Sequence, residues 1–576
     1  MTFTRRFFLC SALFVAAWAG LAYLFHFVFS RYYALPEIFM VQQDRFVLIA
    51  TVPFLLLMTL FRFDGKAARL LPPPAMVLGA ILLFVLIGWA GHYAVFGGYS
   101  LSRDEQMGEF ATFYLREGRL GMPIPAEWRD YVRGINPIFM SVYGGDIAWI
   151  SNYLPVHAAF RALLSHVADP ALTSPLFLGL GYICLWRIAL RLFPDRPDAV
   201  LVTLLLGFSS TQLLVMSMTA YAMSAHFGLN MLWLALFLRD DWKGHAGAAL
   251  VALLAVGLHQ FHFHPMFAAP FILWLAVRRR WGAVAFYLFA YALIAIIWGK
   301  LYPALLADLY SGTKPLQGGK RIDLGFRIYH LITHRLGKDM LPLLNLSRFM
   351  AWNNILLMPL ALLGAMQFRW RRLLSRDATI LMPLAIGCAM GLLVLVYQAH
   401  GWGYRYLHGL IGSFCLLGGF GWVRLSGAGG RLSMRPVWLA VGFALLSGAF
   451  LTMKAHDFVK PYARAYQRAK SVDADIVLID TRGGVFIQDI IRVDDGKLSR
   501  PILMDLDFVR KDTLKHLCDS YKVRLYDWSD FLPLGVPPAR MSHRFSAGRE
   551  KKRAYLESIG CAQEPLAYTR WGWRQN

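Results

Sequence analysis

Long apolar runs alternate with short polar turns from the start of the chain to Met453. Runs such as Phe7 to Ser30, Pro74 to Phe96 and Trp281 to Leu301 are long enough to cross a hydrocarbon core, which needs about 20 apolar residues. None of them alternates apolar and polar residues as a membrane barrel requires. Because a span in lipid must satisfy its own backbone hydrogen bonds, the pattern predicts an all-α polytopic membrane bundle.

The pattern predicts about 13 transmembrane helices. They are expected near residues 7–30, 45–61, 75–97, 171–193, 198–217, 221–239, 246–261, 264–277, 282–301, 351–367, 378–398, 405–424 and 436–453. We interpret residues 1–74 as an N-terminal transmembrane hairpin and residues 75–453 as the membrane core.

Basic residues concentrate in alternate turns between the predicted spans. These turns hold Arg62, Lys66, Arg69, Arg187, Arg191, Arg196, Arg239, Lys243, Arg278, Arg279, Arg280, Arg369, Arg371, Arg372, Arg376, Arg424, Arg431 and Arg435. The opposing short turns hold little beyond Arg31, Arg45 and Arg405. Since cytoplasmic turns of membrane proteins are enriched in Lys and Arg, the pattern predicts a multi-pass protein of the bacterial inner membrane with a cytoplasmic N-terminus.

Two long segments, residues 98–170 and 302–350, are expected on the outer side as functional loops. After Met453 the chain changes to soluble patterning, with expected strands at Ala474–Ile479 and Val523–Tyr526. Residues 454–576 are therefore predicted to form a small periplasmic α/β domain. If this region faces an oxidising compartment, its two cysteines, Cys518 and Cys561, can pair or stay free.

Composition and motifs narrow the function. The chain of 576 residues is 57% hydrophobic and 16% charged, with a formal net charge of +24. The sequence has no basic stripe with interleaved aromatic residues, so it does not indicate nucleic-acid binding. The sequence has no Walker A loop, no Gly-x-Gly-x-x-Gly, no Gly-x-Ser-x-Gly and no paired Cys-x-x-Cys motif, which disfavours ATP-driven transport and hydrolase chemistry.

An acidic pair, Asp104 and Glu105, directly follows the third predicted span in "YSLSRDEQMGEF". Carboxylates at a membrane boundary can act as a general base or hold a metal ion that neutralises phosphate. The alternative is an ordinary helix N-terminus, where acidic residues suit the macrodipole.

Three histidines, His259, His262 and His264, lie in "GLHQFHFHPMF". His259 and His262 share a helical face if the helix persists that far. Such imidazoles can bind zinc or donate to phosphate, or they can simply be interfacial residues at a turn. A divalent ion (Mg²⁺, Mn²⁺ or Zn²⁺) held by Glu105, His259 and His262 is the only candidate cofactor.

Arg405 stands at the outer end of a predicted span in "QAHGWGYRYLHG". A guanidinium suits a phosphate, whereas the alternative is an arginine that snorkels within an aromatic belt. The candidate phosphate-binding residues are Arg405, Tyr404, Tyr406, His262, His264, Lys320 and Arg321.

The order of these segments resembles the GT-C superfamily of polyprenyl-phosphate-sugar-dependent glycosyltransferases, and within it the bacterial aminoarabinose transferase and protein O-mannosyltransferase group. The resemblance lies in the acidic pair, "NYLPVHAAFRALL", "TAYAMSAHFGLNMLW", "GLHQFHFHPMFAAP", "GWGYRYLHGL" and the C-terminal outer domain. It implies that Asp104 activates the acceptor, with Glu105 supporting it or binding metal. Ser224, Ala225 and His226 stand where aminoarabinose transferases carry an acidic residue.

The resemblance implies an inverting hexosyl- or pentosyltransferase. An enzyme of this group is expected to move sugar from a polyprenyl-phosphate donor to a glycolipid, cell-envelope glycan or protein at the periplasmic face. The alternatives are a transporter or flippase of polyprenyl-linked glycans, and an O-antigen polymerase or ligase, which would need outer-loop arginines such as Arg321 or Arg327. The expected partners are the donor, the acceptor and the bilayer, without nucleic acid.

Overall fold

The computed structural model describes residues 2–24, 35–65, 71–135, 139–143, 147–310, 341–368, 375–376, 378–394, 400–427, 432–494, 498–538 and 547–561. The chain divides into two compact units. The helical unit consists of residues 1–95, 154–303 and 321–455, and the second unit consists of residues 96–153, 304–320 and 456–576. The second unit thus joins the first predicted outer loop, as far as residue 153, to the C-terminal region, which the sequence did not indicate.

The helical unit contains a helix at each of the predicted spans. Its elements are α1 (Phe3–Leu24), α2 (Leu35–Phe39), η2 (Met40–Asp44), α3 (Arg45–Met58), α4 (Pro74–Ala94), α7 (Val156–Leu164), η4 (Pro170–Leu172), α8 (Thr173–Leu192), α9 (Pro197–Phe208), α10 (Thr211–Ser217), α11 (Met223–Phe237), α12 (Trp242–Val256), α13 (Phe263–Val277), α14 (Trp281–Ile296), η5 (Ile297–Leu301), α17 (Leu341–Trp352), α18 (Leu357–Ala365), α19 (Leu381–Val394), η8 (Arg405–Leu410) and α20 (Ile411–Ser426). Two further helices, α15 (Tyr302–Leu309) and α21 (Arg435–Lys470), contribute residues to both units.

Within the described residues, 7 helices are long and apolar enough to cross a membrane, or up to 9 if each bent pair counts as one span. The bent pairs are α9 with α10 at 49° and α17 with α18 at 110°. α11, α12, α13 and α19 are apolar but shorter. The helical unit is therefore that of a polytopic membrane protein, and the full count of 13 spans stays a prediction.

Close helix packing in this unit depends on glycine. A Cβ added to Gly364 of α18 would lie 2.1 Å from the carbonyl oxygen of Leu417 in α20. One added to Gly421 of α20 would lie 2.0 Å from the carbonyl oxygen of Leu360. Because only glycine lets the two backbones approach this closely, α18 and α20 form a tight pair of the kind membrane bundles favour.

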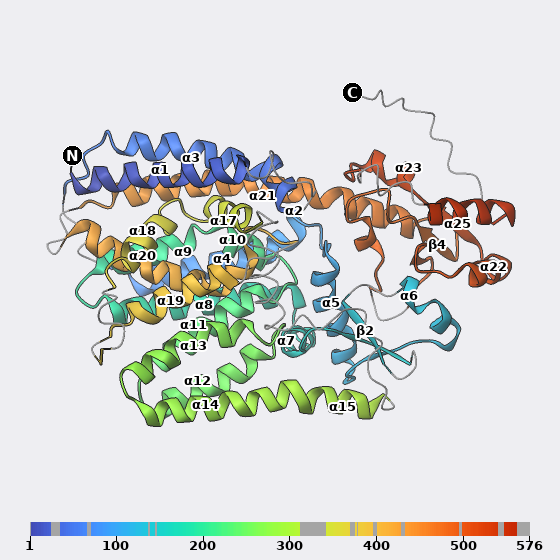
Figure 1. Ribbon diagram of the computed structural model, residues 1–576, viewed down its shortest axis with the longest axis horizontal. Helices are drawn as coiled ribbons and strands as arrows, with labels where there is room; N and C mark the ends of the chain where they lie inside the picture. The colour runs from blue at the N-terminus through green and yellow to red at the C-terminus, as the bar shows by residue number, and fades with distance from the viewer. Residues whose placement is uncertain are drawn as a thin grey trace. The chain divides into compact units, whose positions relative to one another are not determined.

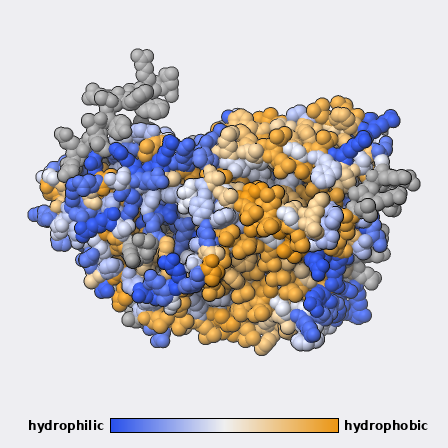
Figure 2. Space-filling view, turned by 180° about the vertical axis from the view of Figure 1, so that it is seen from behind, coloured by the Kyte–Doolittle hydropathy of each residue, from blue (hydrophilic) through white to orange (hydrophobic). Residues whose placement is uncertain are grey.

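The surface of the helical unit is apolar around its middle. Leu446 is 77% exposed and Ile49 is 66% exposed, although both are large aliphatic residues. Figure 2 shows a broad hydrophobic surface on this unit and hydrophilic residues gathered at one end of it. An exposed apolar surface of this extent fits a lipid environment.

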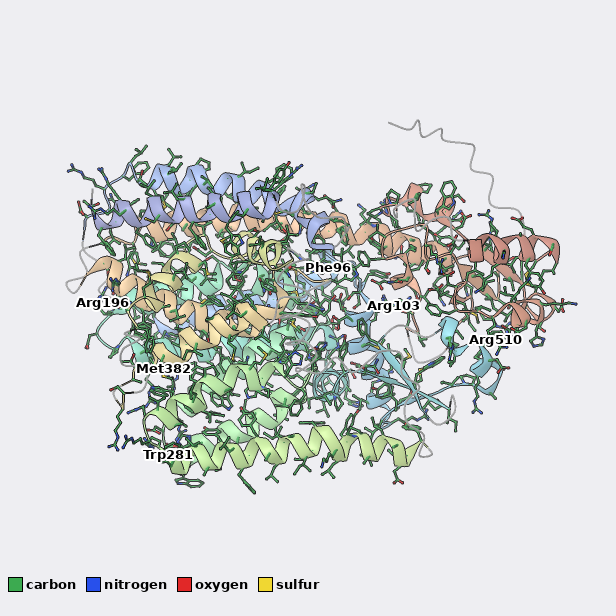
Figure 3. All side chains as sticks on the ribbon, in the orientation of Figure 1. Phe96, Arg103, Arg196, Trp281, Met382 and Arg510 are labelled. Atoms are coloured by element: carbon green, nitrogen blue, oxygen red, sulfur yellow. A yellow bond between two sulfur atoms is a disulfide. The ribbon has the colours of Figure 1, made fainter. Side chains whose placement is uncertain are left out.

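Two of the predicted basic turns lie at one end of the helical unit. Arg280 forms an ion pair with Asp240 at 2.9 Å, and Arg196 donates to the Ser426 hydroxyl at 2.5 Å. Arg196 and Trp281, the residue after Arg280, lie at the same end of the unit in Figure 3. The shared location agrees with the predicted alternation. Lys66, Arg69, Arg369, Arg371, Arg372 and Arg431 lie outside the described residues.

The second unit contains two small sheets. Its elements are α5 (Arg103–Arg116), β1 (Met122–Pro123), η3 (Ala126–Tyr131), α6 (Val132–Ile135), β2 (Met140–Tyr143), β3 (Ala148–Ser151), β4 (Ile476–Ile479), η9 (Ile487–Ile490), β5 (Ile502–Asp505), α22 (Lys511–Ser520), β6 (Val523–Tyr526), α23 (Trp528–Phe531), η10 (Leu532–Leu534) and α25 (Ala547–Ser558). The parallel sheet has the order β5-β4-β6, and the antiparallel sheet has the order β1-β3-β2 (Figure 1). β4 is buried at all four positions, as its unbroken apolar run indicates.

Two features after Met453 refine the sequence prediction. α21 continues to Lys470 instead of ending with the last span near residue 453. Cys518 and Cys561 form a disulfide with Cα atoms 5.5 Å apart, which settles the question that sequence left open. The disulfide joins α22 to the end of α25, so it closes the C-terminal part of the second unit.

Candidate functional site

A glycine-containing turn in the helical unit positions Arg405. Gly401 and Gly403 have φ angles of +121° and +66°, which L side chains rarely adopt. A Cβ on Gly401 would lie 2.6 Å from Cδ of Arg405, so the turn leaves room for the arginine side chain only because this residue is glycine. η8 then begins at Arg405 and leads directly into α20.

Buried side chains hold this turn in place. Gln212 of α10 donates from Nε2 to the carbonyl oxygen of Tyr404 at 2.8 Å and accepts from the Tyr404 amide at 3.0 Å. Arg348 of α17 donates to the carbonyl oxygen of Gly401 at 2.8 Å. These bonds fix the backbone on both sides of the turn, so Tyr404 has a structural role through its main chain.

The Arg405 guanidinium is 3% exposed and lies over two aromatic rings. Its Cζ is 4.6 Å from the ring centroid of Tyr221 and 5.2 Å from that of Tyr406. Such contacts stabilise a cation that has left bulk water and fix the direction in which it points. Arg405 and Tyr406, two of the candidate phosphate-binding residues, are therefore in contact, and their role in binding phosphate stays a prediction.

Arg405 borders a small cavity inside the helical unit. The lining residues are Met223, His226, Asn230, Phe263, Met266, Phe267, Gly387, Gly391, Arg405, Tyr406, Gly409 and Leu410. They come from α11, α13, α19 and η8, and none of them is a carboxylate. The cavity thus combines one fixed cation with an apolar wall.

His226 is the polar side chain that the sequence analysis did not select. It is 2% exposed, lines the cavity, and neither of its ring nitrogens has a hydrogen-bond partner in the described part of the chain. His226 and Asn230 are four residues apart and so share a face of α11. This spacing was the available signal, but the face that carries His226 and Asn230 lies in a helix that is otherwise almost entirely apolar.

His264 has both ring nitrogens engaged. Nδ1 lies 2.7 Å from the side-chain oxygen of Asn230, and Nε2 lies 3.0 Å from the hydroxyl of Tyr291. Asn230 in turn donates to the carbonyl oxygen of Gly409 at 3.0 Å. His264 therefore positions the cavity wall through Asn230 and is not itself a lining residue.

His259 and His262 do not share a helical face. α12 ends at Val256 and α13 begins at Phe263, so both histidines stand in the connecting turn. Residues before α7 bond to this turn, with the Leu154 amide 3.0 Å from the carbonyl oxygen of His259. His262 stacks on Phe263 with ring centroids 4.6 Å apart and is not among the cavity-lining residues.

The acidic pair begins α5 in the second unit. Ser102 caps the helix by accepting from the Glu105 amide at 3.1 Å, and Oε2 of Glu105 accepts from the Leu101 amide at 3.1 Å. Sequence analysis missed this Ser-x-x-Glu capping arrangement, which gives Glu105 a structural role. Asp104, the residue before Glu105, lies in the same first turn and is 9% exposed.

The neighbouring Arg103, labelled in Figure 3, fastens α5 within the second unit. Its guanidinium donates to the carbonyl oxygen of Gln488 at 2.6 Å and lies 3.5 Å from a carboxylate oxygen of Asp489. Burial lowers the pKa of Arg103, and the carboxylates of Asp489 and Asp505 oppose that shift. The acidic pair thus lies at a helix end that is held in place by the Ser102 cap and by the contacts of Arg103.

The remaining predictions of site residues are untested. Lys320 and Arg321 lie outside the described residues, as does Arg327. Across the described ranges, no group of three or more His, Cys, Asp or Glu residues is placed to hold a metal ion. The metal site assigned to Glu105, His259 and His262 stays a prediction.

The helices and the cavity define a class: a polytopic membrane protein whose bundle encloses a cation-bearing pocket, with a separate α/β unit. No protein-family model and no curated protein matches the sequence. Among solved structures, the aminoarabinose transferase ArnT from Cupriavidus metallidurans in the apo state aligns with a TM-score of 0.47 at 11% identity, covering 77% of this chain and 92% of that chain.

Two further solved structures give similar values. ArnT from the same organism bound to undecaprenyl phosphate aligns with a TM-score of 0.44 at 14% identity, covering 76% of this chain and 91% of that chain. The oligosaccharyltransferase of Archaeoglobus fulgidus, tethered to an acceptor peptide, aligns with a TM-score of 0.41 at 11% identity, covering 69% and 58%.

Proposed function

We propose that this protein is a GT-C-type glycosyltransferase that takes a sugar from a polyprenyl-phosphate donor. The observation that carries the proposal is the cavity that Arg405 and His226 both line inside an apolar helical bundle. A buried imidazole whose ring nitrogens have no partner among the described residues is costly in such surroundings, and in membrane proteins buried polar groups mark functional sites. An anionic ligand would give this imidazole a partner beside the Arg405 guanidinium.

The chemistry of the lining favours the phosphate of a lipid over a soluble anion. Arg405 supplies a planar set of donors suited to phosphate oxygens, and His226 can donate a further hydrogen bond. Phe263, Phe267 and Leu410 supply apolar contacts next to these polar groups. An isoprenoid chain with a phosphate head matches this combination.

Asp104 is the proposed general base. Inverting transfer requires a carboxylate that removes the proton from the acceptor hydroxyl while the carrier phosphate departs from the opposite face of the sugar. The carboxylate of Asp104 stands in the first turn of a helix fastened by Arg103, which suits a group that must be held in one position.

We place the reaction at the periplasmic face of the inner membrane, with the N-terminus in the cytoplasm. The Cys518–Cys561 disulfide supports this placement because disulfides persist in oxidising compartments such as the periplasm. The gathering of basic turns at one end of the helical unit supports a cytoplasmic position for that end. The acceptor is a glycolipid, an envelope glycan or a protein.

The decisive experiment is transfer of radiolabelled sugar from a panel of polyprenyl-phosphate donors to membrane lipid, glycan and protein. Wild type is compared with Asp104→Asn and Arg405→Gln, with melting curves to show that each variant is folded. We expect Asp104→Asn to lower kcat about 100-fold or more, as loss of a general base does. Arg405→Gln should chiefly raise the KM for the donor.

Two outcomes would reject the proposal. If folded Asp104→Asn and Arg405→Gln proteins transfer sugar at the wild-type rate, the assigned roles are wrong. If wild type moves an intact lipid-linked sugar across a vesicle membrane but transfers none of it to any acceptor, the protein is a transporter.

A further inference from the structure

The two bent helix pairs of the helical unit are joined where they break. The break between α9 and α10 lies at Ser209 and Ser210, and the break between α17 and α18 includes Asn353 and Asn354. The Ser210 hydroxyl donates to the side-chain oxygen of Asn353 at 2.6 Å, and the side-chain amide of Asn354 donates to the Ser209 hydroxyl at 2.8 Å. All four side chains are buried. These four residues form one hydrogen-bonded joint, here called the break joint.

The break joint also bonds to the backbone that follows each break. The Ser210 hydroxyl accepts from the Leu213 amide of α10 at 3.1 Å, and the side-chain oxygen of Asn354 accepts from the Leu356 amide at 2.9 Å. Backbone groups that a break releases are costly inside an apolar bundle unless they find other partners. The break joint therefore compensates for the two breaks, but it does not account for their occurrence at the same place.

Gln212, in the first turn of α10, connects the break joint to the turn that precedes Arg405. Its side-chain oxygen accepts from the side-chain amide of Asn353 at 3.3 Å. The same oxygen accepts from the Tyr404 amide at 3.0 Å, and Nε2 donates to the Tyr404 carbonyl oxygen at 2.8 Å. The two bonds to Tyr404 fix the orientation of the Gln212 amide, because a reversed amide would place donor against donor and acceptor against acceptor. Gln212 is fully buried.

Both bent pairs contribute to the same turn. A Cβ added to Gly403 would collide with the side-chain oxygen of Gln212, so the turn comes this close to α10 only because that residue is glycine. From the other bent pair, Arg348 of α17 donates to the carbonyl oxygen of Gly401 at 2.8 Å. The turn is thus held by one buried side chain from α10 and one from α17. The shared location of the two breaks brings these side chains to it.

We propose that Gln212 is a positioning residue for the Arg405 guanidinium. Gln212 holds both backbone polar groups of Tyr404, the residue directly before Arg405, and so fixes the point from which the arginine side chain extends. The rings of Tyr221 and Tyr406 hold the other end of that side chain. Donors that recognise a ligand must be held within ~0.5 Å of the productive geometry, and a supporting layer of hydrogen bonds supplies that precision. The proposal rests on the phosphate-binding role of Arg405 proposed above.

The test separates recognition of the phosphate from general packing of the bundle. The probes are geranylgeranyl phosphate and geranylgeraniol, which share one isoprenoid chain and differ in the phosphate. Both are titrated into the full-length protein in detergent, without sugar, by calorimetry. We expect Gln212→Met to bind geranylgeranyl phosphate ~10-fold more weakly than wild type, the scale of one lost hydrogen bond. Its affinity for geranylgeraniol should stay at the wild-type value, because the alcohol has no phosphate for Arg405 to bind.

Gln367→Met is the matched control. Gln367 also donates from its side-chain amide to a backbone carbonyl oxygen, that of Phe420 at 2.8 Å, but it is not among the residues that line the cavity. This variant should bind geranylgeranyl phosphate as wild type does. Asn353→Ala decides the question if Gln212→Met does not fold. It removes a bond to the Gln212 oxygen but leaves both bonds to Tyr404, so we expect a smaller loss of phosphate affinity, ~3-fold.

Four results would overturn the positioning role. They are no binding of geranylgeranyl phosphate by wild type, equal binding by folded Gln212→Met and wild type, an equal loss for the phosphate and the alcohol, or an equal loss in Gln367→Met. Because no sugar is present, the outcome is separate from the proposed transferase function. Sugar transfer by wild type with phosphate binding that is indifferent to Gln212 rejects the positioning role alone. Phosphate binding that depends on Gln212, with no transfer from any donor, counts against the transferase alone.

Discussion

The two units differ in how they accommodate buried charge. In the second unit, arginines face buried carboxylates: the buried Arg103 lies 3.5 Å from Asp489, and the partly exposed Arg553 lies 2.8 Å from Asp527. These pairs join segments far apart in the sequence, since α5 meets η9 and α25 meets the end of β6. In this unit, ion pairs help to hold distant segments of the chain together.

The helical unit contains one buried arginine that faces a carboxylate, Arg348, and another that borders a cavity, Arg405. Arg348, which is fully buried, lies 3.3 Å from Asp44 and 4.4 Å from the Phe39 ring, and Asp44 also accepts from Trp352. Arg405 instead borders a cavity that no carboxylate lines. The difference distinguishes an arginine that holds helices together from one that borders a cavity.

Breaking the structural pair is expected to have the largest effect. Asp44→Asn leaves the Arg348 guanidinium buried without its carboxylate, which costs ~3–5 kcal/mol when a buried pair loses one partner. The measurement is unfolding of the purified protein by heat or by detergent. The double variant Asp44→Asn/Arg348→Met has no uncompensated charge and should recover much of the loss. If single and double variants are equally unstable, the ion pair does not stabilise the bundle.

The helical architecture was predictable from sequence because apolar length alone determines it. A helix occurs at each expected span. The predicted alternation of basic turns agrees with the location of Arg196, bonded to Ser426, and Arg280, paired with Asp240, at one end of the unit. α21 was underestimated because its polar second half, up to Lys470, continues the helix after the apolar pattern stops.

The candidate site was only partly predictable. Arg405 stood out as a rare cation in an outer turn, but His226 sits in a helix whose other residues are mostly apolar, so the short face it shares with Asn230 gives a weak signal. The cavity wall also depends on Gly409, where an added Cβ would lie 2.8 Å from Nδ2 of Asn230. The union of residues 96–153 with the C-terminal region depends on long-range contacts such as Arg103 with Gln488, which no local pattern indicates.

Two histidines of the cavity region sharpen the comparison at a smaller scale. His226→Leu removes a buried polar group that has no partner, so stability should stay equal or rise. His264→Leu leaves Asn230 and Tyr291 without their partner, which costs ~1–3 kcal/mol. In binding of a short polyprenyl phosphate, His226→Leu should weaken affinity ~10-fold, equivalent to ~1.4 kcal/mol. Equal loss of stability in both variants would show that His226 is an ordinary core residue.

The smallest expected effect concerns a carboxylate of the second unit without an arginine bonded to it. Asp505 ends β5 and accepts from the Thr481 hydroxyl and the Asp507 amide. Burial raises its pKa from 3.8 to about 6, although the hydrogen bond from Asp507 and the charge of Arg103 act in the opposite direction. The folded state therefore holds a proton between these values that the unfolded state has released, and stability falls as pH rises through this range.

Asp505→Asn should remove that pH dependence and raise stability above pH 6. The rise in pKa from 3.8 to about 6 corresponds to ~3 kcal/mol, and weaker bonds from Thr481 and Asp507 to the amide reduce the net gain to ~1 kcal/mol. Amide hydrogen-exchange protection of β4 and β5 in the full chain reports the difference. Asp475→Asn is the control of opposite sign. The hydrogen bond from the Lys522 amide lowers the pKa of Asp475, so its stabilisation is present at neutral pH and is lost as pH falls. If both substitutions shift protection in the same direction, burial does not govern the ionisation of Asp505.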